Sequence, residues 1–167
     1  MDGAGSIMRK LDVHADTYRL IPSHFPPIAL FENLLDPQEL DAAYALESLT
    51  NDRLRDEVGD IALIAPEDRV AGSGTTAIMA AFTHVGVESR FTKGLFGVYY
   101  AGLDLDTAMT ESKFSRARFM SATNEGPQVL TMRCYHCVVS ASMVDVRDDH
   151  RAHDSDNFIY AQSLGEK

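Results

Sequence analysis

The sequence has 167 residues, a formal net charge of −10 at pH 7 and an apolar fraction of 45%, so we expect one domain with one hydrophobic core over residues 1–167. The acidic balance argues against sequence-independent binding of nucleic acid, because phosphate contacts need concentrated Lys and Arg. No apolar run approaches a membrane span and the N-terminus lacks the apolar core of a secretory signal, which together predict a cytoplasmic protein.

The N-terminal part predicts one strand and one helix. We expect the first dozen residues to be loose and a strand to pass through Tyr18. Prolines predict that the segment 21–28 runs extended. Pro37 suits the first turn of a helix that reaches about Thr50, with Asp36 as its cap. The apolar stripe of this helix is formed by Ala42, Leu46 and Leu49.

A glycine-containing loop precedes the second predicted helix, Thr75–Thr83. The loop, Gly72–Thr76, resembles one that holds phosphate, because free amides at a helix N-terminus attract anions. It lacks the lysine of a phosphate-binding loop and does not follow an apolar strand. We therefore interpret it as an ordinary flexible start of the helix.

The middle of the chain predicts a strand followed by a helix. The run Leu95–Tyr100 is aromatic and branched and lies between glycines, which is typical of a short, largely buried strand. Asp104 and Asp106 suit an N-cap and a first turn, so we expect a helix over Thr107–Met120.

Glu111 lies near the start of that helix, on the same face as Ala108. We expect its carboxylate beside the strand that carries Tyr100 and against the core. A buried carboxylate needs a partner, and Arg90 is the local candidate. The residues alone leave a structural role open, because strand tyrosines and solvated helical glutamates are common. The basic residues that follow favour a solvated helix face over attraction of an anionic substrate: Lys113, Arg116 and Arg118.

The run Gln128–Val146 predicts one or two strands. Cys134 and Cys137 lie in it and, with His150 and His153, approach a zinc-finger spacing. In a strand an odd separation points two side chains to opposite faces, so we expect no metal site and two reduced thiols.

Four motifs together resemble the signature of the RES-domain family, which is named for an arginine, a glutamate and a serine. They are Tyr18-Arg19, Arg90-Phe91, Gly97–Tyr100 and Thr107-Ala108 leading to Glu111. These proteins are NAD-consuming toxins of type II toxin-antitoxin systems. The similarity runs from about Tyr18 to the end of the chain.

Two differences from the shortest family members bear on this resemblance. The long interval between Arg19 and Arg90 resembles a longer subgroup, some of which modify a protein. The family serine belongs to a late strand, beyond the segment that 157–165 resembles. We therefore expect a domain without its C-terminal strand, and Ser163 is not assigned as the family serine.

The resemblance implies an α+β fold, with an ADP-ribosyltransferase-like core of small antiparallel sheets and peripheral helices. It also implies that NAD is the substrate and that no metal takes part. Glu111 would stabilise the positive charge that develops on the ribose. Tyr100 would orient the nicotinamide, and Arg19 and Arg90 would bind the diphosphate, because arginine donates in pairs to phosphate oxygens.

The acceptor of the ADP-ribose is left open by the sequence. Water would make the protein a glycohydrolase, phosphate a phosphorylase, and a protein side chain an ADP-ribosyltransferase. The subgroup favours protein modification, and phosphoribosyl pyrophosphate synthetase is a target that the resemblance suggests. It also implies a partner, an antitoxin with a helix-turn-helix DNA-binding part. The alternative of another class is a non-enzymatic module that binds NAD or the antitoxin.

Overall fold

The structure is a computed structural model that describes residues 9–22, 29, 41–42, 44–46, 48–49 and 58–166. Its elements follow the order β1 (Lys10–Pro22), the 3-10 turns η1 (Ile61–Leu63) and η2 (Pro66–Asp68), α3 (Thr75–Thr83), α4 (Leu105–Ser121), β2 (Met132–Val144), the 3-10 turn η3 (His150–His153) and α5 (Ile159–Gly165). Helices combined with a small antiparallel sheet confirm the α+β class.

The sheet is a two-stranded ribbon in which β1 and β2 run antiparallel, from the pair Lys10 and Val144 to the pair Pro22 and Met132. The expected strand through Tyr18 is therefore confirmed, and the later run forms one strand. Residues 10–12 are paired with β2, so the expectation that the first dozen residues are loose is wrong for these three. Backbone hydrogen bonds to β2 hold this end of the strand, because the exposed Lys10 side chain does not pack against the core.

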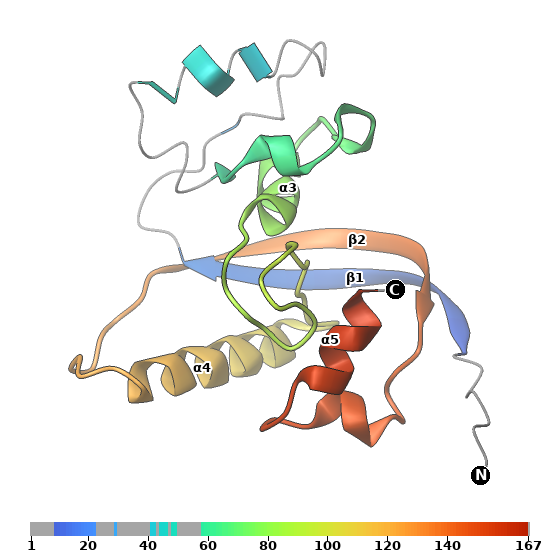
Figure 1. The fold of residues 1–167 in the computed structure, drawn as a ribbon, viewed down its shortest axis with the longest axis vertical. Coiled ribbons are helices and arrows are strands. Elements are labelled where there is room, and N and C mark those ends of the chain that lie inside the picture. Colours follow the sequence, from blue (N-terminus) through green and yellow to red (C-terminus); the bar gives the residue numbers. More distant parts are fainter. Residues whose placement is uncertain are drawn as a thin grey trace.

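Two helices lie on opposite sides of the ribbon, α3 on one and α4 on the other (Figure 1). The predicted bounds of α3 are confirmed residue for residue. The helix α4 begins two residues earlier than expected and is capped by Asp104, whose carboxylate accepts a 2.7 Å hydrogen bond from the Thr107 backbone N–H.

The expected strand Leu95–Tyr100 is not formed. The segment runs extended or bent, and Leu95 is 74% exposed. Gly97 packs directly on the last turn of α3, because a Cβ atom there would lie 2.2 Å from the Ala81 carbonyl oxygen. Pairing with β1 begins only at Gly102, which exchanges two backbone hydrogen bonds with Tyr18, of 2.8 and 2.9 Å. This segment therefore packs against the helix α3 instead of pairing as the predicted strand.

The larger buried apolar side chains lie around α3. Val58, Ile61 and Met79 are at most 3% exposed. The predicted N-terminal helix is helical at 41–42 and 44–46, and its Pro37 and Asp36 lie outside the described residues. Its predicted apolar stripe is exposed, namely Ala42, Leu46 and Leu49. Within the described ranges, the helices are too short or too polar to cross a membrane.

Candidate functional site

Arg19 and Tyr100 are brought together at the edge of β1. The Arg19 Nη1 atom donates a 3.1 Å hydrogen bond to the Tyr100 carbonyl oxygen. The Arg19 guanidinium carbon also lies 5.2 Å from the centre of the Tyr99 ring. The bridge between Tyr18 and Gly102 aligns the two segments, so the first arginine of the motif meets the tyrosine pair through backbone pairing.

The Arg19 guanidinium lacks an acidic partner among the described residues, and its Nε atom is buried without a hydrogen-bond partner there. Burial lowers the pKa of Arg19, because desolvation disfavours its charge, and only a weaker effect of Tyr99 opposes this. Most buried charges are paired, so a half-buried cation in this state is suited to an anionic ligand.

The Tyr100 hydroxyl connects this edge to the turn that carries Arg90. It shares a 2.8 Å hydrogen bond with Ser89 Oγ and accepts a 3.2 Å hydrogen bond from the Phe91 backbone N–H. The Tyr100 and Phe91 rings are 6.5 Å apart. Arg19, Tyr100 and the turn around Arg90 therefore form one connected group.

Arg90 is held by the C-terminal part of the chain. Its Nη1 atom donates to the carbonyl oxygens of Ala152 and Asp154, each at 3.2 Å, and its guanidinium carbon lies 5.4 Å from the Phe158 ring centre. The buried Gln162 of α5 fixes the same turn by donating to the Ser89 carbonyl oxygen at 3.2 Å. Arg90 thus has partners of its own, and the expectation that it pairs with Glu111 is wrong.

Glu111 lies on α4 and is exposed. The expectation that it packs against the core is also wrong. Ala108 occupies the close contact, because its backbone nitrogen lies 2.8 Å from the place where a Gly102 Cβ atom would be. Ala108 is buried in this contact, whereas the Glu111 side chain, one turn later, lies in water. Its carboxylate makes no hydrogen bond or ion pair with any residue that the structure describes.

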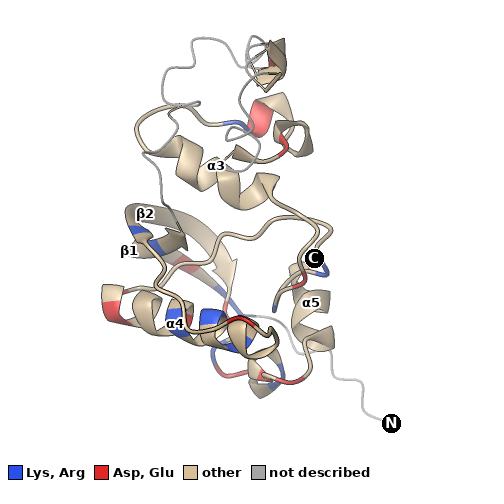
Figure 2. Ribbon diagram, turned by 90° about the vertical axis from the view of Figure 1, so that its left-hand side faces the viewer, with Lys and Arg blue, Asp and Glu red and all other residues tan. Residues whose placement is uncertain are grey.

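Charged residues of both signs lie on α4 (Figure 2), but Asp106 and Glu111 come first and the basic residues all follow them. Arg118 does more than face water, because its Nη1 atom donates a 2.8 Å hydrogen bond to the Ser155 carbonyl oxygen. Its guanidinium carbon lies 5.7 Å from the Phe158 ring centre. Arg118 therefore ties the end of α4 to the segment that also holds Arg90.

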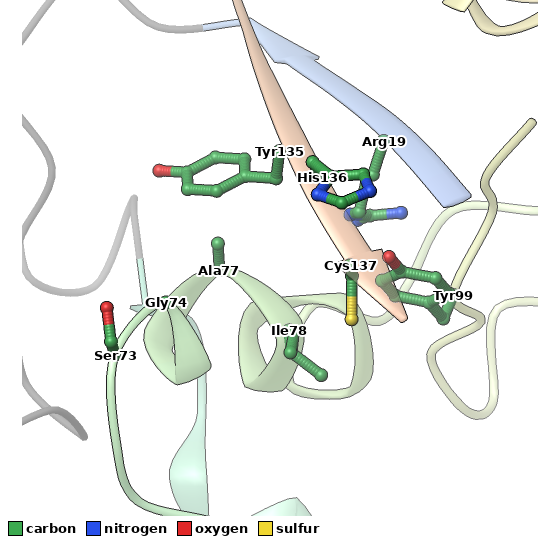
Figure 3. A pocket seen from close by; sticks show the side chains of 9 residues that line it. All are labelled: Arg19, Ser73, Gly74, Ala77, Ile78, Tyr99, Tyr135, His136 and Cys137. Carbon is green, nitrogen blue, oxygen red and sulfur yellow. The ribbon is translucent and has the colours of Figure 1, made fainter. Parts of the chain in front are cut away.

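A cavity of about 250 Å³ lies between the ribbon and α3 (Figure 3). Arg19, Tyr99 and Tyr135 line it on the ribbon side, and Ser73, Gly74 and Ala77 line it on the side of α3. The sequence predicts only a flexible helix start for the loop before α3, and Tyr135 carries no signal in the sequence. Its position follows from the register, in which Tyr135 is paired with Arg19.

Comparison with known proteins gives two findings. A model of the RES domain matches residues 66–167, a range that contains Arg90, Tyr100 and Glu111. The uncharacterized protein y4oC of Sinorhizobium fredii (strain NBRC 101917 / NGR234) is 34% identical over 141 residues, which cover 84% of this chain and 60% of that protein. The chain therefore spans less than two thirds of the length of this relative.

Proposed function

This chain belongs to the RES-domain family, and we propose that it binds NAD and cleaves the bond between nicotinamide and ribose. The observation that carries the proposal is the connected group of motif residues. Arg19 bonds to Tyr100, and Tyr100 bonds to the turn around Arg90. The same backbone continues from Tyr100 into α4, which carries Glu111. Arg19 from the N-terminal strand therefore meets the stretch that carries Arg90 and Tyr100, and Glu111 follows eleven residues after Tyr100.

The reaction breaks the bond between the ribose C1′ atom and the nicotinamide nitrogen. The bonding electron pair goes to that nitrogen, so nicotinamide leaves as a neutral molecule and the ribose becomes oxocarbenium-like. The Glu111 carboxylate, exposed and without a partner among the described residues, is available to the ribose hydroxyls and to the positive charge. The acceptor then attacks C1′ and loses its proton.

Two arginines would hold the diphosphate of NAD. Arg19 would offer its Nη2 group, because its Nε atom is shut off from solvent, while Arg90 uses its Nη1 atom for the carbonyl oxygens of the C-terminal part. The Nε and Nη2 donors of Arg90 make no hydrogen bond to any described residue and would serve the ligand. Tyr100, fixed through its hydroxyl, would orient the nicotinamide ring.

The acceptor we propose is a protein side chain, which makes the chain an ADP-ribosyltransferase and the toxin of a toxin-antitoxin pair. Phosphoribosyl pyrophosphate synthetase is a candidate target, and an antitoxin with a helix-turn-helix domain is the proposed partner. Water or phosphate as the acceptor would give a glycohydrolase or a phosphorylase instead. A chain that binds NAD or the antitoxin without turnover is the alternative of another class.

The test is proton NMR of NAD incubated with the protein in phosphate and in phosphate-free buffer, with Glu111→Gln in parallel. We expect the parent to release nicotinamide and the variant to release far less. Release that depends on phosphate would identify a phosphorylase. Equal release by parent and variant would remove Glu111 from the mechanism, and absence of release with retained NAD binding would favour the binding module.

A further inference from the structure

The cavity between the ribbon and α3 has a cation on one side that the protein itself does not neutralise. Arg19 points into it, with a buried Nε atom that lacks a partner and no acidic neighbour within the described ranges (Figure 3). Because this Nε atom is shut off from solvent, a ligand in the cavity would meet the guanidinium through its Nη2 group, which makes no hydrogen bond to any described residue. The cavity is therefore suited to an anionic group next to Arg19.

The described lining includes three aromatic rings, one of them a histidine, and no Asp, Glu, Lys or second Arg, so it suits a flat aromatic group. Tyr135 and Tyr99 present rings from the ribbon side, and Ala77 and Ile78 present apolar side chains from α3 (Figure 3). The Tyr99 hydroxyl lies 3.5 Å from Thr17 Oγ1, and burial raises the pKa of this tyrosine, so it stays neutral at neutral pH. Neutral rings and aliphatic carbons stack well on heteroaromatic bases.

The size of the cavity limits what it can hold. Its volume of about 250 Å³ is below the range of about 300–1,000 Å³ that is usual for whole drug-sized ligands. One base with its sugar phosphate therefore fits better than an entire dinucleotide. Ser73 and Gly74 lie at the start of α3, where no side chain caps the helix, and they close the wall across from the strands.

We propose that this cavity binds a nucleoside 5′-phosphate unit, with the phosphate on Arg19 and the base between Tyr135 and the apolar side of α3. The identity of the unit as one half of NAD depends on the proposed function, whereas its binding can be measured without any turnover. An adenosine phosphate and a nicotinamide ribose phosphate share this chemistry. The cavity thus adds Tyr135 and Ala77 to the residues that the family motif supplies.

The experiment is calorimetric titration of the full chain with AMP, with nicotinamide mononucleotide and with inorganic phosphate. We expect one of the two mononucleotides to bind at least about tenfold more tightly than phosphate, because base stacking adds to the phosphate contact. Equal affinity for all three would show an anion site without base recognition and would overturn the proposal. Absence of binding by both mononucleotides would also overturn it.

Filling the cavity provides the matched pair of variants. Ala77→Met places a larger side chain in the cavity, whereas Ala80→Met makes the same change on α3 at a half-buried position outside the lining. We expect mononucleotide affinity to fall about tenfold or more in the first and to stay near the parent value in the second. Far-ultraviolet circular dichroism and thermal melting check that both variants fold.

Two further pairs of substitutions can be interpreted even if the cavity does not accept a larger side chain. Tyr135→Phe keeps the ring and should retain affinity, while Tyr135→Ala removes it and should lose about tenfold. Arg19→Gln should weaken mononucleotides and phosphate alike, whereas Arg9→Gln, an exposed control, should weaken neither. Unchanged affinity in both Tyr135→Ala and Arg19→Gln would overturn the proposal even if Ala77→Met failed to fold.

The outcomes also separate this inference from the proposed function. Mononucleotide binding that depends on Tyr135 and Arg19, without nicotinamide release by the parent, would keep the cavity and remove NAD cleavage. Nicotinamide release at the parent rate by Tyr135→Ala and Ala77→Met, without mononucleotide binding by the parent, would keep NAD cleavage and remove the cavity.

Discussion

The two sides of the ribbon treat their charged residues in opposite ways. On the side of α3, Arg19 is half-buried, bonded to the Tyr100 carbonyl oxygen and desolvated. On the side of α4, Glu111 is exposed, and its carboxylate has no hydrogen-bond or ion-pair partner among the described residues. The sequence assigns both to the family motif, and Glu111 lies within the range that the family model matches, whereas Arg19 lies outside it. The fold itself therefore fixes the cation, whereas a substrate would position the carboxylate.

The largest expected effect is on the exposed side. Glu111→Gln should lower the rate of nicotinamide release by about a hundredfold or more, because it removes the charge that stabilises the ribose cation. The melting temperature should stay unchanged, since the side chain has no partner to lose among the described residues. A large fall in melting temperature would contradict this contrast between Arg19 and Glu111, because it would show that Glu111 supports the fold. Rates are followed by proton NMR and stability by calorimetry.

Arg90 tests whether the fold itself holds the arginines of the candidate site in place. Arg90→Ala removes two charge-assisted hydrogen bonds to carbonyl oxygens, and we expect the free energy of unfolding to fall by about 2 kcal/mol. Urea denaturation measures this change. Arg116→Ala on the exposed face of α4 is the control and should change stability by less than about 0.5 kcal/mol. Equal effects of the two substitutions would contradict the anchoring role of Arg90.

Gly97 tests how the tyrosine pair is positioned. A Cβ atom there would lie 2.2 Å from the Ala81 carbonyl oxygen and 2.5 Å from the Phe82 Cα atom. Gly97→Ala should therefore cost about 1–3 kcal/mol and displace the segment that carries Tyr99 and Tyr100. Gly126→Ala is a matched control, because nothing lies within 4 Å of its Cβ position. A neutral Gly97→Ala variant would refute the close packing of this segment on α3.

The smallest expected effect concerns the start of α4. Hydrogen bonds from the Thr107 backbone N–H and hydroxyl hold the pKa of Asp104 below its ordinary value. The carboxylate cap therefore contributes stability above the unfolded pKa, and this contribution is lost as the pH falls through the folded pKa. Asp104→Ala should lower the melting temperature slightly at neutral pH and less in acid. Asp104→Asn, which keeps an acceptor but does not titrate, should show a weaker dependence on pH.

The features that local sequence signals specify were predicted well. The bounds of α3 and the cap at Asp104 follow from helix propensity and from hydrogen bonds within a few residues. The run 95–100 failed for the opposite reason. Its composition is typical of a strand, but Gly97 packs against the end of α3, and β1 offers it a pairing position only at Gly102.

Predictions about the site also divide into features that local sequence signals specify and features that depend on long-range contacts. The motif identified residues that the fold brings together, Arg19 and Tyr100, although their contact needs backbone pairing over a long sequence separation. Helical periodicity placed Glu111 on the face of Ala108, but of these two residues Ala108 is buried and Glu111 is exposed. The proximity of Tyr135 to Arg19 depends on the register between β1 and β2, which no local pattern specifies.

The pairing of β1 with β2 also determines when the protein can fold during its synthesis. The N-terminal strand is made first, and its partner follows only after the whole chain between residues 22 and 132. At about 5–20 residues per second, β1 waits for seconds with an unpaired edge, which is a template for aggregation. Its exposed positions include Lys10, Asp12 and Asp16. We expect these charges to keep the growing chain apart from its neighbours until β2 emerges from the ribosome.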